Sequence, residues 1–197
     1  LQKEHKEVHP IHHPQNKGYG GAVKSGLFGG KNDYIFFSDS DGQFDLEEVF
    51  NLIYSAFGNK AESDLVKQLM LDKDLFFSLV YESPDAILGN VVVSKMAMKP
   101  VTNLLIGGVA PLSVLPKSQS AGIGAQLMRA AITKSRGMKL DALFLLGDPN
   151  YYGRFNFKVS NLANDYSSEY FQALELTKDC LVDVKSKVIY ANAFASL

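Results

Sequence analysis

The sequence predicts a mixed α/β domain that follows a polar N-terminal extension. Amphipathic helical patterns at 62–71 and 123–136 alternate with short apolar runs at 75–82, 87–96 and 140–146. The first 30 residues are instead rich in glycine, histidine and polar side chains, with few large apolar residues at either period. Of 197 residues, 46% are hydrophobic and 21% are charged, which is enough apolar material for one sizeable core.

Composition excludes several classes of protein. A net charge of −1 argues against a binder of nucleic acid that works by phosphate neutralisation, and no apolar run is long enough to span a bilayer. Cys180 is the only cysteine, so we expect no internal disulfide, no thiolate metal cage and a cytoplasmic location. A site built outside the first 13 residues works without imidazole, because the histidines are His5, His9, His12 and His13.

The first elements follow the extension. An aromatic run at 34–38 predicts a buried strand, and a polar loop follows it. Asp45 is a suitable N-cap for a helix that ends at Gly58, with acidic residues in its first turn where the helix dipole favours them. The apolar face of this helix is expected from Val49, Phe50, Ile53 and Phe57.

The later part of the chain is expected to contain strands and a short helix. The strands at 75–82 and 87–96 are joined by Ser-Pro-Asp-Ala, which favours a tight turn. A third strand is expected at 104–115, with interruptions at its two adjacent glycines and at Pro111. A short helix is expected at 151–155, and the final strands are expected at 173–176 and 188–190.

The strongest chemical signal is the segment LSVLPKSQSAGIGAQL at 112–127. It predicts a strand, a short turn and then glycines that open an amphipathic helix. Such an arrangement points unpaired N–H groups at one spot, and the missing side chains of Gly122 and Gly124 let an anion approach. Either this loop binds phosphate, or it is a tight turn that needs glycine for its dihedral angles.

Three separated elements resemble the GNAT family of acyltransferases. Residues 119–124 match the signature Q/R-x-x-G-x-G/A, and 112–116 resemble the strand before it. The segment 152–157 resembles the Y-x-x-x-G-F element, with Asn156 in place of glycine, and the preceding Gly-Asp-Pro indicates the YhbS-like branch. The resemblance covers about 45–197 and implies an α/β (α+β) fold with a mixed, mostly antiparallel central sheet flanked by helices.

By this resemblance the cosubstrate is acetyl-CoA. The backbone of Leu112, Ser113 and Val114 is expected to pair with the pantetheine arm and to polarise the thioester carbonyl. Tyr152 is expected to protonate the departing thiolate; its other interpretation is a core ring whose hydroxyl bonds a backbone carbonyl. The loop residues expected to bind the cosubstrate are Gln119, Ser120, Ala121, Gly122, Ile123, Gly124 and Ala125.

The base that takes the proton of the amine is left open. Glu82, Asp148 or a chain of water molecules could serve, although each acid also fits a capping or solvated role. An acceptor amine with a low pKa would need no dedicated base.

The front of the chain resembles a different family. Residues 16–48 are similar to the GT-A glycosyltransferases of family 2, such as the dolichyl-phosphate mannose synthases, in which paired acids hold a divalent cation. Here those acids are Asp39 and Asp41, and the alternative interpretation is a charged turn ahead of a helix. We therefore expect a hybrid chain, with a glycosyltransferase-like fragment at 1–33 and an acyltransferase domain at 34–197.

The function predicted is acetyl-CoA-dependent acetylation of an amine, by direct attack of the amine on the thioester. The first rival is a coenzyme A-binding protein without efficient turnover, and the second is a metal-dependent remnant that binds a sugar nucleotide. The acceptor is expected to be a small-molecule or peptide amine, with no nucleic acid or membrane as partner. The chain is expected to be a monomer or a homodimer.

Overall fold

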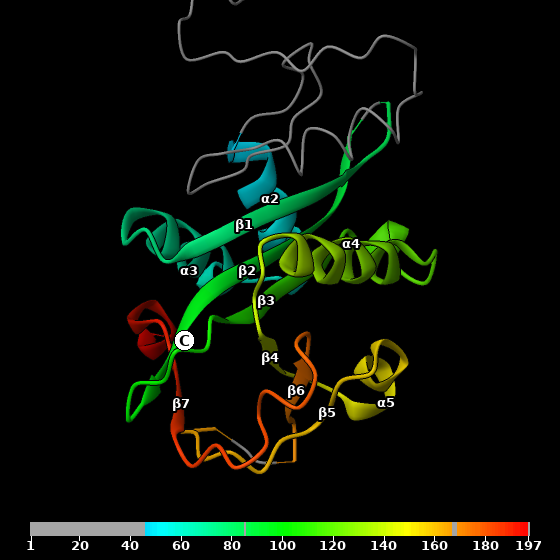
Figure 1. The fold of residues 1–197 in the computed structure, drawn as a ribbon. Coiled ribbons are helices and arrows are strands. Elements are labelled where there is room, and N and C mark those ends of the chain that lie inside the picture. The colour runs from blue at the N-terminus through cyan, green and yellow to red at the C-terminus, as the bar shows by residue number, and fades with distance from the viewer. Residues whose placement is uncertain (1–45, 85, 167–168, 197) are drawn as a thin grey trace, which may run out of the picture.

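The computed structural model describes residues 46–84, 86–166 and 169–196, and these form a seven-stranded mixed sheet (Figure 1). The strand order is β1-β2-β3-β4-β6-β5, and β7 pairs with the last part of β2. Among the strands described, the pairing of β3 with β4 is parallel and the others are antiparallel, so the predicted mixed, mostly antiparallel sheet is confirmed. The strands are β1 (Leu75–Glu82), β2 (Ile87–Lys99), β3 (Ile106–Val114), β4 (Ala142–Leu146), β5 (Lys158–Val159), β6 (Phe171–Glu175) and β7 (Lys187–Tyr190).

Helices cover both faces of this sheet, with α2 and α3 on one face and α4 on the other (Figure 1). No helix in the described part of the chain is long and apolar enough to cross a membrane. The α-helices are α2 (Leu46–Phe57), α3 (Ala61–Leu71), α4 (Ile123–Gly137) and α5 (Pro149–Tyr152), and the 3₁₀ turns are η1 (Pro116–Ser118), η2 (Gly153–Phe155) and η3 (Asn192–Ser196).

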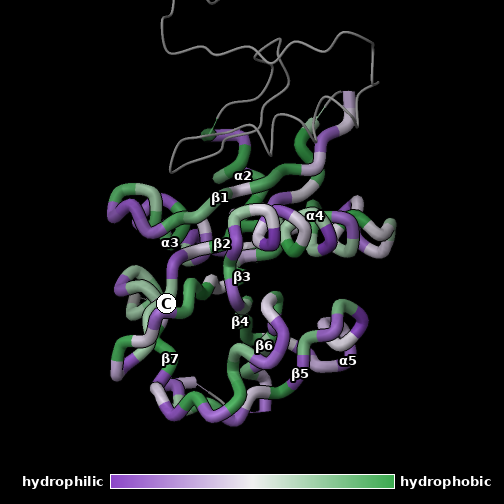
Figure 2. Tube along the Cα trace, in the orientation of Figure 1, coloured by the Kyte–Doolittle hydropathy of each residue, from purple (hydrophilic) through white to green (hydrophobic). Residues whose placement is uncertain are grey.

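The sheet divides the core into two clusters. Val92 of β2 packs in the cluster with α2 and α3, whereas its neighbours Val91 and Val93 pack in the cluster with α4. This alternation follows from the pleat, which turns successive side chains to opposite faces. Figure 2 shows hydrophilic and hydrophobic residues alternating along α4, as expected for a helix with one face on the sheet.

Several predictions fall outside the described residues. These are the strand at 34–38, the capping residue Asp45 and the acidic pair Asp39 and Asp41. They remain predictions, as does the division of the chain at residue 33.

Helix α2 largely follows its predicted pattern. Val49, Phe50 and Ile53 of the predicted apolar face are buried, whereas Phe57 of the same face is 40% exposed. Phe57 lies in the last turn of the helix, and the buried residues of α2 end at Ile53. The final turn therefore extends beyond the part of the helix that packs on the sheet.

Strands β2 and β3 differ from their predicted form. Strand β2 continues past Met96, because Met96–Lys99 pairs with β7. Strand β3 runs without interruption through its two glycines, so the irregularity predicted there is wrong. The irregularity predicted at Pro111 is found, at Ala110 and Pro111. From Val109 to Leu112 strand β3 advances three residues, while its partner β2 advances two, between Val93 and Val91. This mismatch is a β-bulge, which accommodates the proline.

Strands β3 and β4 separate soon after they meet. They pair only at Ile106 with Ala142, Gly107 with Leu143 and Gly108 with Phe144. Strand β3 then continues to residue 114 with β2 as its partner on one side. Among the described residues no strand pairs with its other edge over 109–114, so backbone donors and acceptors there face a gap between β3 and β4.

Candidate functional site

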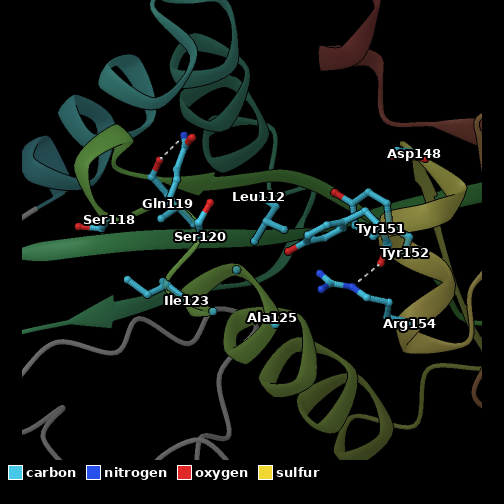
Figure 3. Close-up of a pocket in the computed structure, with 13 residues that line it drawn as sticks. Leu112, Ser118, Gln119, Ser120, Ile123, Ala125, Asp148, Tyr151, Tyr152 and Arg154 are labelled. Atoms are coloured by element: carbon cyan, nitrogen blue, oxygen red, sulfur yellow. Dashed lines mark hydrogen bonds between the residues drawn. The ribbon is translucent and has the colours of Figure 1, made fainter.

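A cavity of about 690 Å³ lies where the end of β3, the start of α4 and the α5–η2 segment meet (Figure 3). One side is formed by Ser120 and residues 122–125, which we call the amide wall. The opposite side is formed by Tyr151, Tyr152 and Arg154, which we call the tyrosine wall. The remaining lining residues come from β3, η1 and the start of α5; they are Leu112, Val114, Ser118, Gln119 and Asp148.

The amide wall presents unpaired backbone donors. The first hydrogen bond of α4 runs from the amide of Gln126 to the carbonyl of Gly122 at 3.1 Å, so the three amides before Gln126 have no acceptor within the helix. The N-cap, Gly122, supplies no side-chain cap. Together with the positive end of the helix dipole, these N–H groups form a site for an anion.

The two glycines of the amide wall are favoured for different reasons. Gly122 has a φ of +81°, and no atom lies within 4 Å of the place its Cβ would occupy, so the backbone conformation demands glycine. A Cβ on Gly124 would instead lie 2.8 Å from the hydroxyl oxygen of Tyr151. The close approach of the tyrosine wall therefore favours a small residue at position 124.

Gln119 braces the loop that leads to α4. Its side-chain amide donates to the carbonyl of Val114 at 3.2 Å and ties the turn back to the end of β3. Of the ten residues predicted to bind a cosubstrate, eight line the cavity. Ala121 and Ser113 do not: Ala121 is exposed, and Ser113 is buried within β3.

Tyr152 stands beside the end of β4. Its ring covers Gly147, where a Cβ would collide with it, and it meets Phe157 edge-on at 6.2 Å between ring centroids. Burial and, secondarily, the nearby Tyr151 raise the pKa of Tyr152 to about 12. Its hydroxyl has no hydrogen bond to any residue in the described ranges, so the carbonyl partner considered from the sequence is not found there.

Tyr151 and Arg154 belong to the site although sequence analysis did not select them. The rings of Tyr151 and Tyr152 pack edge to face, with 4.9 Å between their centroids and 77° between their planes. The Arg154 guanidinium carbon lies 4.3 Å above the Tyr151 ring, and Arg154 Nε donates to the Tyr151 carbonyl at 3.1 Å. Their i, i+3 spacing in a short helical segment was the available signal, because such residues share a helical face.

The turn after the tyrosine wall has the predicted conformation. Asn156 has a φ of +68°, in the left-handed region that asparagine tolerates. It follows Phe155 and precedes Phe157, both buried. Asparagine thus replaces the glycine of the Y-x-x-x-G-F element without loss of the turn.

The two candidate acids occupy different places. The Asp148 carboxylate lines the cavity and caps α5, accepting from the backbone amide of Asn150 at 2.9 Å and from its side chain at 3.1 Å. Glu82 ends β1 and is not among the lining residues. Among the residues with described positions, no three histidine, cysteine or acidic side chains form a metal cluster.

Comparisons with known proteins agree with both resemblances. The family model for glycosyl transferase family 2 matches residues 1–67. Two N-acetyltransferases of Escherichia coli K12, both named as uncharacterized, are 29% identical to this chain. YjhQ aligns over 136 residues, 68% of this chain and 74% of that protein, and YhbS aligns over 153 residues, 73% and 89%.

Solved structures match the same part of the chain. A GNAT family acetyltransferase from Brucella melitensis, in complex with acetyl-CoA, is 32% identical and has a TM-score of 0.65. The match covers 75% of this chain and 90% of that one. YhbS from Escherichia coli, in complex with CoA, is 28% identical with a TM-score of 0.71, covering 76% of this chain and 86% of that one.

Proposed function

We propose that this chain, which belongs to the GNAT family of N-acetyltransferases, transfers the acetyl group of acetyl-CoA to an amine. One observation carries the proposal: the amide wall, Leu112 and Val114 at the end of β3, and Tyr152 all line one cavity. A diphosphate needs backbone N–H donors, a pantetheine arm needs an open strand edge, and a thioester needs a proton donor for its leaving thiolate.

The residues present fit the cosubstrate. The amides of Ile123, Gly124 and Ala125 suit a diphosphate, since they lack helical acceptors and lie at the positive end of α4. The backbone of residues 112–114 faces the gap between β3 and β4, where an extended pantetheine arm can pair as a strand does. An N–H in this segment would polarise the thioester carbonyl.

Tyr152 is the proposed general acid. In the reaction, the bond between the amine nitrogen and the acetyl carbon forms as the carbon–sulfur bond breaks, and the tyrosine proton passes to the thiolate. Its ring lies over Gly147 at the end of β4, across the gap from β3. The hydroxyl is protonated at neutral pH, as a proton donor requires, and burial raises its pKa further, to about 12.

The acceptor is proposed to be a small-molecule or peptide amine. Asp148 already caps α5, which leaves water as the simplest route for the proton that the amine loses. We place the reaction in the cytoplasm, because a single cysteine suits a reducing compartment. The catalytic unit is proposed to be a monomer or a homodimer.

Calorimetry with coenzyme A, followed by an assay of thiol release from acetyl-CoA with a panel of amines, tests this function. We expect both binding and amine-dependent release. Binding without release from any amine class would instead support a coenzyme A-binding protein with little turnover. Absence of binding to the folded chain would refute the proposal altogether.

A second candidate function rests on the family 2 match at residues 1–67. We propose that residues 1–33 are a glycosyltransferase-like fragment ahead of an acyltransferase domain at 34–197. In this proposal Asp39 and Asp41 hold a divalent cation on a sugar nucleotide. A thermal shift with UDP- or GDP-sugar and Mn²⁺ that is lost in the Asp39→Asn, Asp41→Asn double variant would support it. No shift with the wild-type chain would refute it.

A further inference from the structure

The cavity contains a cation, Arg154, that forms no ion pair with a carboxylate in the described part of the chain. Its charged lining residues are Asp148 and Arg154, and the Asp148 carboxylate is occupied as the cap of α5. The ion pairs found among the described residues are Lys178 with Asp179 and Lys187 with Asp165, so neither includes Arg154. The positive charge of Arg154 is therefore available to a ligand in the cavity.

The Arg154 guanidinium is also held in place before any ligand arrives. It stacks 4.3 Å above the Tyr151 ring and 5.4 Å from the Phe155 ring centroid. Its Nε donates to the carbonyl of Tyr151, which leaves the two terminal nitrogens with their hydrogens. A planar, stacked guanidinium with free terminal N–H groups has the geometry that binds phosphate oxygens in pairs.

Tyr151 connects this cation to the amide wall. Its hydroxyl oxygen lies 2.8 Å from the place of a Cβ on Gly124, in the first turn of α4. The ring of Tyr151 therefore crosses the cavity from α5 to the N-terminus of α4, with the Arg154 guanidinium stacked on it. Figure 3 shows Arg154 reaching from the α5 side toward the start of α4.

We propose that Arg154 binds the diphosphate of coenzyme A from the side opposite the amide wall, and that Tyr151 is its positioning residue. This inference rests on the proposed function, since it assumes that the diphosphate binds at α4. The backbone amides of the amide wall and the Arg154 guanidinium then bind the same diphosphate from opposite sides. The location of Tyr151 against Gly124 assigns Arg154 to the diphosphate and not to the 3′-phosphate of the ligand.

Calorimetric titration with coenzyme A and with dephospho-coenzyme A, which lacks the 3′-phosphate, tests the assignment. Arg154→Ala is expected to weaken the binding of both ligands about tenfold, because charge-assisted hydrogen bonds to the diphosphate are lost. Arg129→Ala is the matched control: Arg129 lies 5.8 Å from the Phe155 ring centroid but does not line the cavity. It is expected to change neither affinity by more than about twofold.

The positioning role of Tyr151 has its own readout. Tyr151→Leu is expected to weaken binding about as much as Arg154→Ala, and Tyr151→Phe, which keeps the ring, to recover most of that loss. Equal losses in the Leu and Phe variants would show that the ring is not the support. Thermal unfolding of each variant without ligand verifies that it is folded.

The outcomes separate this inference from the function on which it rests. If the wild-type chain binds neither ligand, the proposed function fails. If it binds and Arg154→Ala binds equally well, only the role of Arg154 fails. A loss confined to coenzyme A, with dephospho-coenzyme A unaffected, would assign Arg154 to the 3′-phosphate and overturn the proposal.

Discussion

The two walls of the cavity obtain their chemistry in different ways. The amide wall works through its main chain, because its donors are N–H groups left free at the start of α4. The tyrosine wall works through side chains, whose positions depend on how Tyr151, Tyr152 and Arg154 stack on one another. Substitutions should therefore act on the first wall through backbone conformation and on the second through the loss of particular atoms.

The largest effect is expected from Tyr152→Phe, which removes one oxygen from the tyrosine wall and keeps the ring that packs on Gly147. We expect turnover to fall about 100-fold or more, since general acid catalysis is lost. Coenzyme A affinity should change little. Steady-state kinetics and calorimetry measure the two quantities, and normal turnover in this variant would disprove the role of Tyr152 as the acid.

On the amide wall, Gly124→Val is expected to weaken coenzyme A binding by about tenfold or more. The new side chain would meet the Tyr151 hydroxyl and push the two walls apart. Gly153→Ala is the matched control, because no atom lies within 4 Å of its Cβ position and its φ is −55°. Calorimetry should show a loss for the first variant only; equal affinities would contradict the assigned close approach.

A smaller effect, on stability, is expected from Gly122→Ala. A φ of +81° is unfavourable for alanine, so the free energy of unfolding should fall by about 1–2 kcal/mol. Ser120→Gly is the opposite change in the same loop, since Ser120 has a φ of +62°, and it should not destabilise the protein by the same route. Denaturant unfolding measures both variants, and an unchanged midpoint for Gly122→Ala would show that the loop relaxes.

The smallest effect concerns the ionisation of Tyr152. Burial favours its neutral form in the folded chain and raises its pKa from 10.0 to about 12. Its contribution to stability is therefore complete below pH 10 and is lost as the pH rises through about 12. When the ultraviolet titration curve of Tyr152→Phe is subtracted from that of the wild-type chain, the difference should show one tyrosine ionising near pH 12. A difference centred near pH 10 would show that Tyr152 is not buried in solution.

Elements specified by local pattern were predicted well. The predicted strand at 75–82 coincides with β1, and the predicted helix at 123–136 differs from α4 by one residue. The two-residue strand β5 was missed, because it exists only through its pairing with β6. The continuation of β2 beyond Met96 was missed for the same reason, since its partner β7 is about 90 residues away.

The candidate site shows the same division. The amide wall could be predicted because glycines at fixed spacing before an amphipathic helix are a local signal. Tyr151 and Arg154 could not be selected in that way, since their roles come from a cavity that joins α4 to the α5–η2 segment. The inward direction of the Ser113 side chain likewise depends on which face of β3 is covered.

The narrow contact between β3 and β4 has a mechanical consequence. Three residue pairs, at Ile106–Ala142, Gly107–Leu143 and Gly108–Phe144, hold the larger part of the sheet to the part formed by β4, β6 and β5. Few backbone hydrogen bonds cross this contact, so the pairing of the two parts is weakest here. A molecule lodged in the widening gap beyond it would act as a clamp between the two parts.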